Sequence, residues 1–389
     1  MVRQPIRKRI LEAKPELARV PFNTLLVDGS NLMEVCWAAS DEVSSNGRRV
    51  GGIYQFLFQV RALLEKGNFR HCFCFFDGDS SGELRHNLYY QYKANRDKTF
   101  SDDNLSDYMK EVDAKIRFMQ QKLYKKPKRT ESEKENFFWQ KDIVMRCLEE
   151  LFVRVVCCDK TEADDFIGYY VSHKAPEERI VICSNDRDLT QLISDDVIVY
   201  VQSMHDFVNT KNHTEKLGYD YRNVKLKKIV CGDASDNIKG IKGVGEKTFL
   251  DNFPEVKERE VSLEEVIEKA RRLNEARVAE KKNPLKWAEN IVNAVTDGCQ
   301  GNRAYEINDA IIDLKNPLMT DESKELMDSY IGSPMDPEGR SFANLYGILM
   351  EAGVDSFRDE TRFGNFFNIF NYLIDSERKF AKSVSNEET

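Results

Sequence analysis

The chain has 389 residues, 41% of them hydrophobic, and a formal net charge of −8. This length allows one large domain or two ordinary ones with an ample core. No apolar run approaches the length of a membrane span, and no secretory signal is visible. Nine cysteines without a C-x-x-C pair are typical of reduced thiols, so we expect a cytoplasmic protein with no membrane partner.

The acidic total does not exclude a nucleic-acid partner, because the local distribution of charge decides such binding. Nine carboxylates are assigned below to a metal site, and removing their charge from −8 leaves about +1 for the rest of the chain. Basic side chains concentrate in 85–129 and in 225–247. A binding surface for phosphates therefore remains possible on composition alone.

After an N-terminal arm, 1–22, short apolar runs alternate with helix-length segments such as 52–66 and 136–151. The runs 23–28, 71–76 and 179–183 are each followed or ended by acids, as when buried parallel strands present carboxylates at their carboxyl ends. This alternation predicts an α/β core over 23–218 with a doubly wound, mainly parallel sheet. Acids at three strand ends would then converge on one crevice, and Ser30 would cap the first helix.

A further group of acids lies at the start of a predicted helix near 161–168. Thr161 is a good N-cap, and the helix dipole favours acids in the first turn. Capping explains one or two of these acids, but not Glu162, Asp164 and Asp165 together. Glu162 and Asp165 are spaced i, i+3 and share a helix face.

Asp186 and Asp188 lie on one side of the chain if their segment is extended. Carboxylates held this close repel one another unless cations neutralise them. Acids from several segments, without histidine or cysteine partners, indicate an oxygen-only site for Mg²⁺ or Mn²⁺ rather than Zn²⁺. Beside a phosphate-binding backbone, such a site favours metal-assisted hydrolysis of phosphodiesters.

The most informative stretch is 232–248, GDASDNIKGIKGVGEKT. If Asp233 and Asp236 sit in one helical turn, both point the same way and can share a cation. The glycines that follow allow tight turns and close approach to a ligand. Lys247 and Thr248 begin a helix whose N-terminus attracts phosphate. The alternative is a solvated glycine-rich surface loop, because G-x-x-G-x-G is weak by itself.

Two regions outside this framework remain open. A charged insertion, 91–135, contains YKANRD at 92–97 and is either a solvated excursion or a functional segment. Beyond 219 the chain is mostly helical, with a joint near 332–339, a helical extension over 333–382 and a charged tail, 383–389, expected to be disordered. The aromatic run 363–370 favours core packing over a docking motif for a sliding clamp or single-strand-binding protein.

Taken together, the motifs resemble the 5′ nuclease superfamily of flap endonucleases and 5′→3′ exonucleases, and most resemble its bacteriophage members, including the phage RNase H type. The resemblance covers about residues 23–330. It rests on VDGSNL at 27–32, FDGD at 76–79, YKANRD at 92–97, TEADD at 161–165, SNDRD at 184–188 and the stretch 232–248.

The resemblance implies roles for individual residues. Those matching the family's metal-site acids are Asp28, Asp77, Glu162, Asp164, Asp165, Asp186, Asp188, Asp233 and Asp236. Lys93 and Arg96 match the pair that contacts the scissile phosphate at the base of a helical arch, here 91–135, and Tyr92 matches a residue that stacks on a base. The glycine stretch matches a helix-three-turn-helix that grips duplex backbone and often holds K⁺; its residues here are Gly240, Lys242, Gly243, Gly245, Lys247 and Thr248.

The resemblance also implies a substrate and partners. Backbone contacts position DNA without reading its sequence, so we expect cleavage at 5′ ends, nicks, flaps or RNA primers of duplex DNA with two or more divalent ions. We expect a monomer, in a phage or bacterial host cytoplasm, working with a separate polymerase chain. Single-strand-binding protein or a sliding clamp could be partners. One alternative is a PIN-type endoribonuclease, which would not need the glycine stretch. The other is a non-catalytic DNA-binding protein, which would not need the full set of acids.

Overall fold

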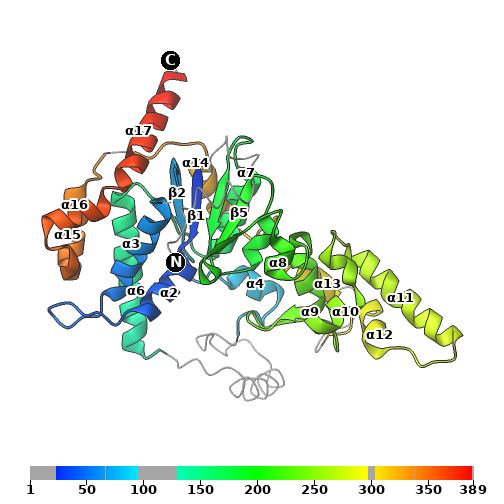
Figure 1. Cartoon of the computed structure of the whole chain (residues 1–389). Coiled ribbons are helices and arrows are strands. Elements are labelled where there is room, and N and C mark those ends of the chain that lie inside the picture. The colour runs from blue at the N-terminus through cyan, green and yellow to red at the C-terminus, as the bar shows by residue number, and fades with distance from the viewer. Residues whose placement is uncertain (1–22, 66, 95–128, 297–302, 337, 388–389) are drawn as a thin grey trace. The chain divides into compact units, whose positions relative to one another are not determined.

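A computed structural model describes residues 23–65, 67–94, 129–296, 303–336 and 338–387 (Figure 1). The chain forms two compact units. Unit 1 comprises Met1–Ser81, Glu135–Val224 and Asp313–Thr389, and unit 2 comprises Gly82–Lys134 and Lys225–Ile312. The polypeptide therefore leaves unit 1 and returns to it twice.

Unit 1 is built on a six-stranded sheet with the strand order β3-β2-β1-β4-β5-β6. All neighbouring strands are parallel except β5 and β6, which run antiparallel. The predicted doubly wound α/β fold is confirmed. The strands are β1 (Thr24–Asp28), β2 (His71–Phe75), β3 (Arg154–Val156), β4 (Ile180–Cys183), β5 (Val197–Val201) and β6 (Asp206–Val208).

Both faces of the sheet are covered because alternate side chains of each strand point to opposite faces. Cys72 and Cys74 of β2 join a core with α2 (Gly29–Ala39), α3 (Gly51–Leu64) and α6 (Glu131–Glu150). Phe73 and Phe75 point the other way, where they pack on Tyr170 and Phe166 of α7 (Ala163–His173) at ring-centroid distances of 4.7 and 6.3 Å. The apolar runs of the sequence are thus two-sided strands.

The C-terminal part of unit 1 consists of α14 (Asp321–Tyr330), α15 (Phe342–Ala352), η7 (Asp355–Phe357), α16 (Glu360–Phe367) and α17 (Phe370–Glu387). Phe363, Phe366, Phe367 and Phe370 are buried in the same core as α3 and α6, so the expected core role of the aromatic run is confirmed. The expectation of a disordered tail from 383 is wrong, because α17 remains helical to Glu387.

A buried ion pair attaches α17 to the sheet edge where β2 and β3 begin. Glu377, 1% exposed, accepts from the His71 imidazole at 2.8 Å and lies 3.6 Å from the guanidinium of Arg154. Arg154 also donates to the carbonyl oxygens of Tyr330 and Ser333. A buried carboxylate is tolerated only when paired in this way, so these contacts fix the position of the C-terminal helix.

Unit 2 is mainly helical and has its own hydrophobic core. Its elements are α4 (Glu83–Leu88), α9 (Val224–Cys231), the two-stranded hairpin β7 (Gly232–Asp233) and β8 (Ile238–Lys239), α10 (Glu246–Asn252), η6 (Pro254–Lys257), α11 (Leu263–Ala279), α12 (Lys286–Val292) and α13 (Arg303–Ile312). Ser262 and Glu265 form a capping box at the start of α11, which explains where that long helix begins.

Strands β5 and β6, the helix α8 (His213–Leu217) and the 3₁₀ segments η3 (Asp188–Leu192), η4 (Gln202–Met204) and η5 (Tyr221–Asn223) were not anticipated from sequence. They are short, and their hydrophobic periodicity covers too few residues to be distinguished from a loop.

Candidate metal centre

Asp28 is the acid at the carboxyl end of β1, and its carboxylate is almost completely buried at 4% exposure. One oxygen accepts from the Asn31 amide at 2.9 Å and caps α2, so Asp28 is the N-cap that the sequence had suggested for Ser30. The other oxygen accepts from the Ser184 hydroxyl at 2.6 Å. The side chain is therefore held in one orientation by β1, α2 and the end of β4.

The electrostatic surroundings of Asp28 are unusual for an acid. Burial raises its pKa to about 7, the bonds from Ser184 and Asn31 oppose this increase, and the charges of Asp77 and Asp186 add to it. The carboxylates at the ends of β1, β2 and β4 are thus close enough to repel one another. A bound divalent cation would remove this repulsion, so the donor set fits such an ion.

Asp77 follows β2 and connects to two neighbouring elements. Its amide donates to the Ser30 hydroxyl at 2.8 Å, and its carboxylate accepts from the Ala163 amide, also at 2.8 Å. Asp77 thereby satisfies the N-terminus of α7 from outside that helix. The prediction of Thr161 as the N-cap is wrong, since Glu162 occupies that position and the buried Thr161 hydroxyl bonds to Ser323 at 2.6 Å.

Glycine after Asp77 has a steric cause that the sequence pattern did not reveal. A β-carbon at Gly78 would lie 1.8 Å from the carbonyl oxygen of Cys158. The Gly78 amide also donates to the Thr161 carbonyl at 3.2 Å. Only glycine allows the two loops to approach this closely, and that approach aligns Asp77 with the start of α7.

The acids after β4 form a turn rather than the extended segment expected from their spacing. The Asp186 carboxylate accepts from the Asp188 amide at 2.8 Å, and the Asp186 amide donates to the Ser184 hydroxyl at 2.9 Å. Asp188 then opens η3. Ser184 therefore links Asp28 to Asp186, a supporting role that its position directly after a strand could have suggested.

The acids of α7 differ in their surroundings. Asp165 is fully buried, and one of its oxygens accepts from the Leu318 amide at 3.2 Å, so it ties α7 to the segment before α14. Glu162 is buried and Asp164 half-buried. Glu162 directly precedes Ala163, the residue whose amide donates to the strand-end acid Asp77. If Asp165 binds a metal ion as predicted, it does so while one of its oxygens also accepts the hydrogen bond from Leu318.

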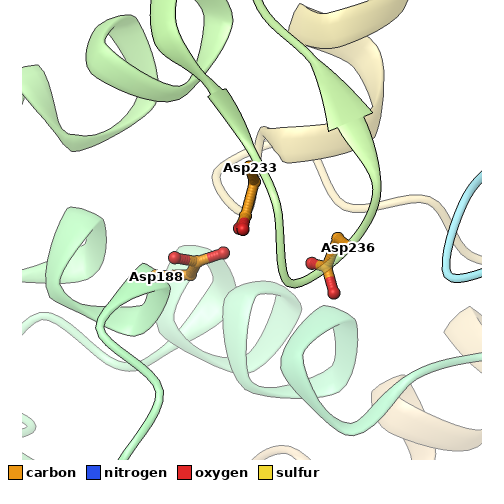
Figure 2. Close-up of side chains that lie close together, drawn as sticks. All are labelled: Asp188, Asp233 and Asp236. Carbon is orange, nitrogen blue, oxygen red and sulfur yellow. The ribbon is translucent and has the colours of Figure 1, made fainter. Parts of the chain in front are cut away.

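In unit 2, Asp233 and Asp236 lie on the β7–β8 hairpin and not in one helical turn as expected (Figure 2). The same figure labels Asp188 at the start of η3 in unit 1. The Asp233 carboxylate accepts from the Ser235 amide at 2.7 Å and from the Lys228 ammonium. Although burial opposes it, the charge and hydrogen bond of Lys228 and the bonds of Ser235 lower the pKa of Asp233 to about 2.

The same hairpin contacts the segment that carries Lys93. The Lys93 amide donates to the Asp236 carbonyl at 2.8 Å, and the buried Asn237 amide donates to the Gln91 carbonyl at 2.8 Å. Lys93 and Asn237 both adopt positive φ, at 51° and 58°. Two motifs 140 residues apart in the chain are therefore held together within unit 2 by one backbone hydrogen bond and one from the Asn237 side chain, a coupling that sequence spacing could not reveal. Arg96 and most of the predicted arch lie outside the described residues.

Tyr92, which the resemblance assigns to base stacking, lies in the core of unit 2. Its ring is 3% exposed and belongs to the core of unit 2, with the Arg85 guanidinium 5.6 Å and the Lys93 ammonium 4.9 Å from the ring centroid. A tyrosine that stacks on a base needs an accessible face. This placement is that of a packing residue and gives base stacking no support.

The glycine stretch is an exposed turn with two kinds of glycine. A β-carbon at Gly240 would lie 2.1 Å from the Cys231 carbonyl carbon, so this glycine is needed for the fold of the hairpin itself. Gly243 has a φ of +81°, whereas Gly245 is the N-cap of α10 with open space around it. Lys242, Gly243, Gly245 and Lys247 are exposed and Thr248 is half-buried. Helices α9 and α10 flank the stretch, and its helix-three-turn-helix assignment stays a prediction.

Comparison with known proteins gives the family. Residues 23–218 match the family model described as the 5′–3′ exonuclease, N-terminal resolvase-like domain. The chain belongs to the 5′–3′ exonuclease family. It is therefore a hydrolase of the 5′ nuclease superfamily, as the motifs had implied. The matched range contains seven of the nine predicted metal acids, all of which lie in unit 1.

Individual relatives support the same assignment. The 5′–3′ exonuclease of Mycoplasmopsis pulmonis is 27% identical over 248 residues, 62% of this chain and 70% of that protein. DNA polymerase I of Bacillus subtilis is 24% identical over 279 residues, which are 70% of this chain but only 28% of the polymerase. The similarity to the polymerase therefore concerns one part of that larger protein.

Among solved structures, the 5′-exonuclease of bacteriophage T5 with divalent zinc ions bound superposes with a TM-score of 0.53 at 17% identity, covering 90% of this chain and 99% of that one. The same coverage, identity and TM-score hold for a complex of the phage T5 flap endonuclease with DNA and metal ions. At this identity the likeness establishes a shared fold. Among the described residues, no helix is long and apolar enough to cross a membrane.

The raised pKa of Asp28 predicts a pH-dependent stability. Its ordinary pKa is 3.8 and its folded value about 7, so the folded state binds the proton more tightly. The contribution of Asp28 to the free energy of unfolding is fully present below about pH 4. It is lost as the pH rises through about 7, and the loss is at most a few kcal/mol. In EDTA, Asp28→Asn should therefore lose less stability than wild type between about pH 5 and pH 8. Urea unfolding at both pH values measures the two free energies of unfolding. Equal losses of stability in wild type and Asp28→Asn would contradict the prediction. Asp321→Asn, at the exposed start of α14, is the control.

Proposed function

We propose that this protein is a structure-specific 5′ nuclease that uses Mg²⁺ or Mn²⁺ to hydrolyse phosphodiester bonds at 5′ ends, flaps or RNA primers of duplex DNA. The observation that carries the proposal is the gathering of acids at one sheet edge: Ser184 bonds to both Asp28 and Asp186, and the charges of Asp77 and Asp186 help to raise the pKa of the buried Asp28. Carboxylates held this close are suited to bind cations. Family membership gives the reaction class, and the acid site supports its metal dependence.

The residues proposed as ligands are those of the predicted set. Asp77 and Asp186 each accept an orienting hydrogen bond on one carboxylate oxygen, whereas Asp28 accepts one on each oxygen; each bonded oxygen keeps a further lone pair that could bind a cation. Glu162, Asp164, Asp165 and Asp188 extend the set within unit 1, and Asp233 and Asp236 are included because their stretch resembles the family motif. When bound, two divalent cations lower the pKa of the attacking water and stabilise the leaving oxygen.

Other residues would position the substrate. We propose that Lys93, with Arg96, contacts the scissile phosphate and offsets the negative charge that develops there. The P–O3′ bond would break, leaving a 5′-phosphate on one product and a 3′-hydroxyl on the other. The exposed turn 242–248, with Lys242, Lys247 and Thr248, would contact the duplex backbone, and K⁺ on the carbonyl oxygens of this turn belongs to the same proposal.

The deciding experiment compares a 5′-labelled flap, a nicked duplex with a 5′-RNA segment, and single strands, each with Mg²⁺ or EDTA. We expect metal-dependent cleavage of the branched or nicked duplexes and poor cleavage of single strands. Cleavage of single-stranded RNA alone would instead indicate a PIN-type endoribonuclease. Binding of branched duplex without any cleavage would leave a DNA-binding protein. The phage T5 structure with DNA and metal ions makes the flap the first substrate to test.

Asp186→Asn separates a catalytic role from a structural one. The amide oxygen still accepts from the Asp188 amide, while one anionic ligand and its repulsion with Asp28 are lost. We expect kcat to fall by at least about a hundredfold, with an unfolding free energy unchanged or raised by up to about 1 kcal/mol. Thermal melts and single-turnover cleavage measure the two quantities. Marked destabilisation would mean a structural acid; Asp142→Asn on the exposed face of α6 is the control.

Lys93→Ala should reduce the rate of the chemical step by about two orders of magnitude or more and change duplex affinity by no more than about twofold. Lys247→Ala at the exposed start of α10 is the matched comparison, and it should weaken affinity while preserving the saturated rate. Single-turnover rates and equilibrium binding in EDTA separate these effects. If affinity falls as much as rate in Lys93→Ala, this lysine has only a binding role.

A further inference from the structure

A basic helical hairpin projects from unit 2 and has no role in the site described above. It consists of the second half of α11, the connecting loop and the start of α12, residues 271–286 (Figure 1). This segment carries six basic and two acidic side chains, a net charge of +4 in a chain whose total is −8. The basic residues are Arg271, Arg272, Arg277, Lys281, Lys282 and Lys286. Such a local reversal of charge marks a surface that attracts anions.

The basic groups are accessible and only weakly engaged. Five of the six are exposed, and Arg277 is half-buried. Lys282 pairs with Glu280 at 2.7 Å and Lys286 with Glu289 at 2.9 Å, all four of them exposed side chains. Exposed pairs of this kind contribute about 0 to 1 kcal/mol, so a phosphate can replace the acid at little cost. Among the described residues, Lys281 has no acidic partner.

The hairpin is held rigid by hydrogen bonds across its loop. The Asn274 side chain accepts from the Leu285 amide at 2.8 Å and donates to the Leu285 carbonyl at 3.2 Å. The Arg277 guanidinium donates to the Asn283 carbonyl at 2.9 Å, and the Lys282 amide donates to the Arg277 carbonyl at 2.8 Å. A preorganised basic surface loses less conformational entropy on binding than a flexible chain does.

The hairpin is also continuous with the proposed backbone-binding turn. Trp287 of α12 lies directly under Gly243, with its Cβ 3.7 Å from where a β-carbon on that glycine would be. The Asn290 side chain donates to the Lys242 carbonyl at 2.8 Å. Both elements therefore belong to one packed structure within unit 2, and a ligand that lies on 242–248 can continue along the hairpin.

We infer that residues 271–286 form a second phosphate-binding surface that extends the contact with duplex DNA beyond the glycine-rich turn. The inference rests on the proposed function, because it assumes that unit 2 binds duplex backbone. The nine helical residues from Arg271 to Ala279 rise about 13 Å, which corresponds to about four base pairs at 3.4 Å each. The surface would select DNA by the length of the duplex and the charge of its backbone, and it would not distinguish base sequences.

The test is the triple variant Lys281→Ala, Lys282→Ala and Lys286→Ala, compared with a triple variant of unit 1. That control, Lys324→Ala, Arg358→Ala and Lys382→Ala, removes the same charge from exposed positions, two of them also paired with exposed acids. Binding to plain duplexes of increasing length is measured in EDTA over a range of salt, so that cleavage is not needed. Flap cleavage with Mg²⁺ is measured in parallel.

For long duplexes, the hairpin variant should bind more weakly, and its slope of log affinity against log salt should fall by about three relative to wild type. For duplexes too short to reach the hairpin, the two proteins should bind equally, and flap cleavage at saturation should be retained. An unchanged salt slope, or an equal loss in the unit 1 control, overturns the hairpin surface. Failure of the wild type to bind any duplex overturns the proposed function together with it.

Discussion

The gathering of several carboxylates at one edge of a parallel sheet is the constraint on which the structure of unit 1 depends. Parallel strands bring their carboxyl ends to the same edge, and β1, β2 and β4 each place an acid there. Burial and mutual repulsion oppose the ionised form of Asp28, as its raised pKa shows. Such an arrangement lowers stability by itself, and it persists because the surrounding framework holds each side chain in place.

That framework uses the acids as structural elements. Asp28 caps α2, Asp77 caps α7, and Asp186 closes the turn into η3. Ser184 joins two of them, and Gly78 allows the loop after β2 to contact the loop before α7. Each orienting hydrogen bond occupies one lone pair of a carboxylate oxygen, and the remaining lone pairs are those that the proposed cations would use.

Unit 2 is the part of the chain to which we assign the binding of a long anionic ligand. The backbone hydrogen bond from the Lys93 amide to the Asp236 carbonyl connects the Lys93 segment to the β7–β8 hairpin. Lys93, which we propose contacts the scissile phosphate, and Asp236 are therefore positioned together. Helix α12 supports the exposed turn 242–248 from below through Asn290 and Trp287. The basic hairpin 271–286 continues from the same helix. A net acidic chain can therefore present a basic, rigid surface, because charge is segregated between regions.

The sequence by itself determined the fold class and the family, and it located acids at the ends of strands, because strand periodicity and strand-end motifs are local features of the chain. It also located α14 and the core role of the phenylalanines near 363–370. Tertiary structure decided what each acid and glycine contacts. Thr161 did not cap α7 because Asp77, 84 residues earlier, supplies that bond, and Asp165 turned to the Leu318 amide. Tyr92 was buried by neighbours from α9 and α13 that no local pattern connects to it. Such pairings depend on which segments pack together, and a single sequence does not show which distant segments are in contact.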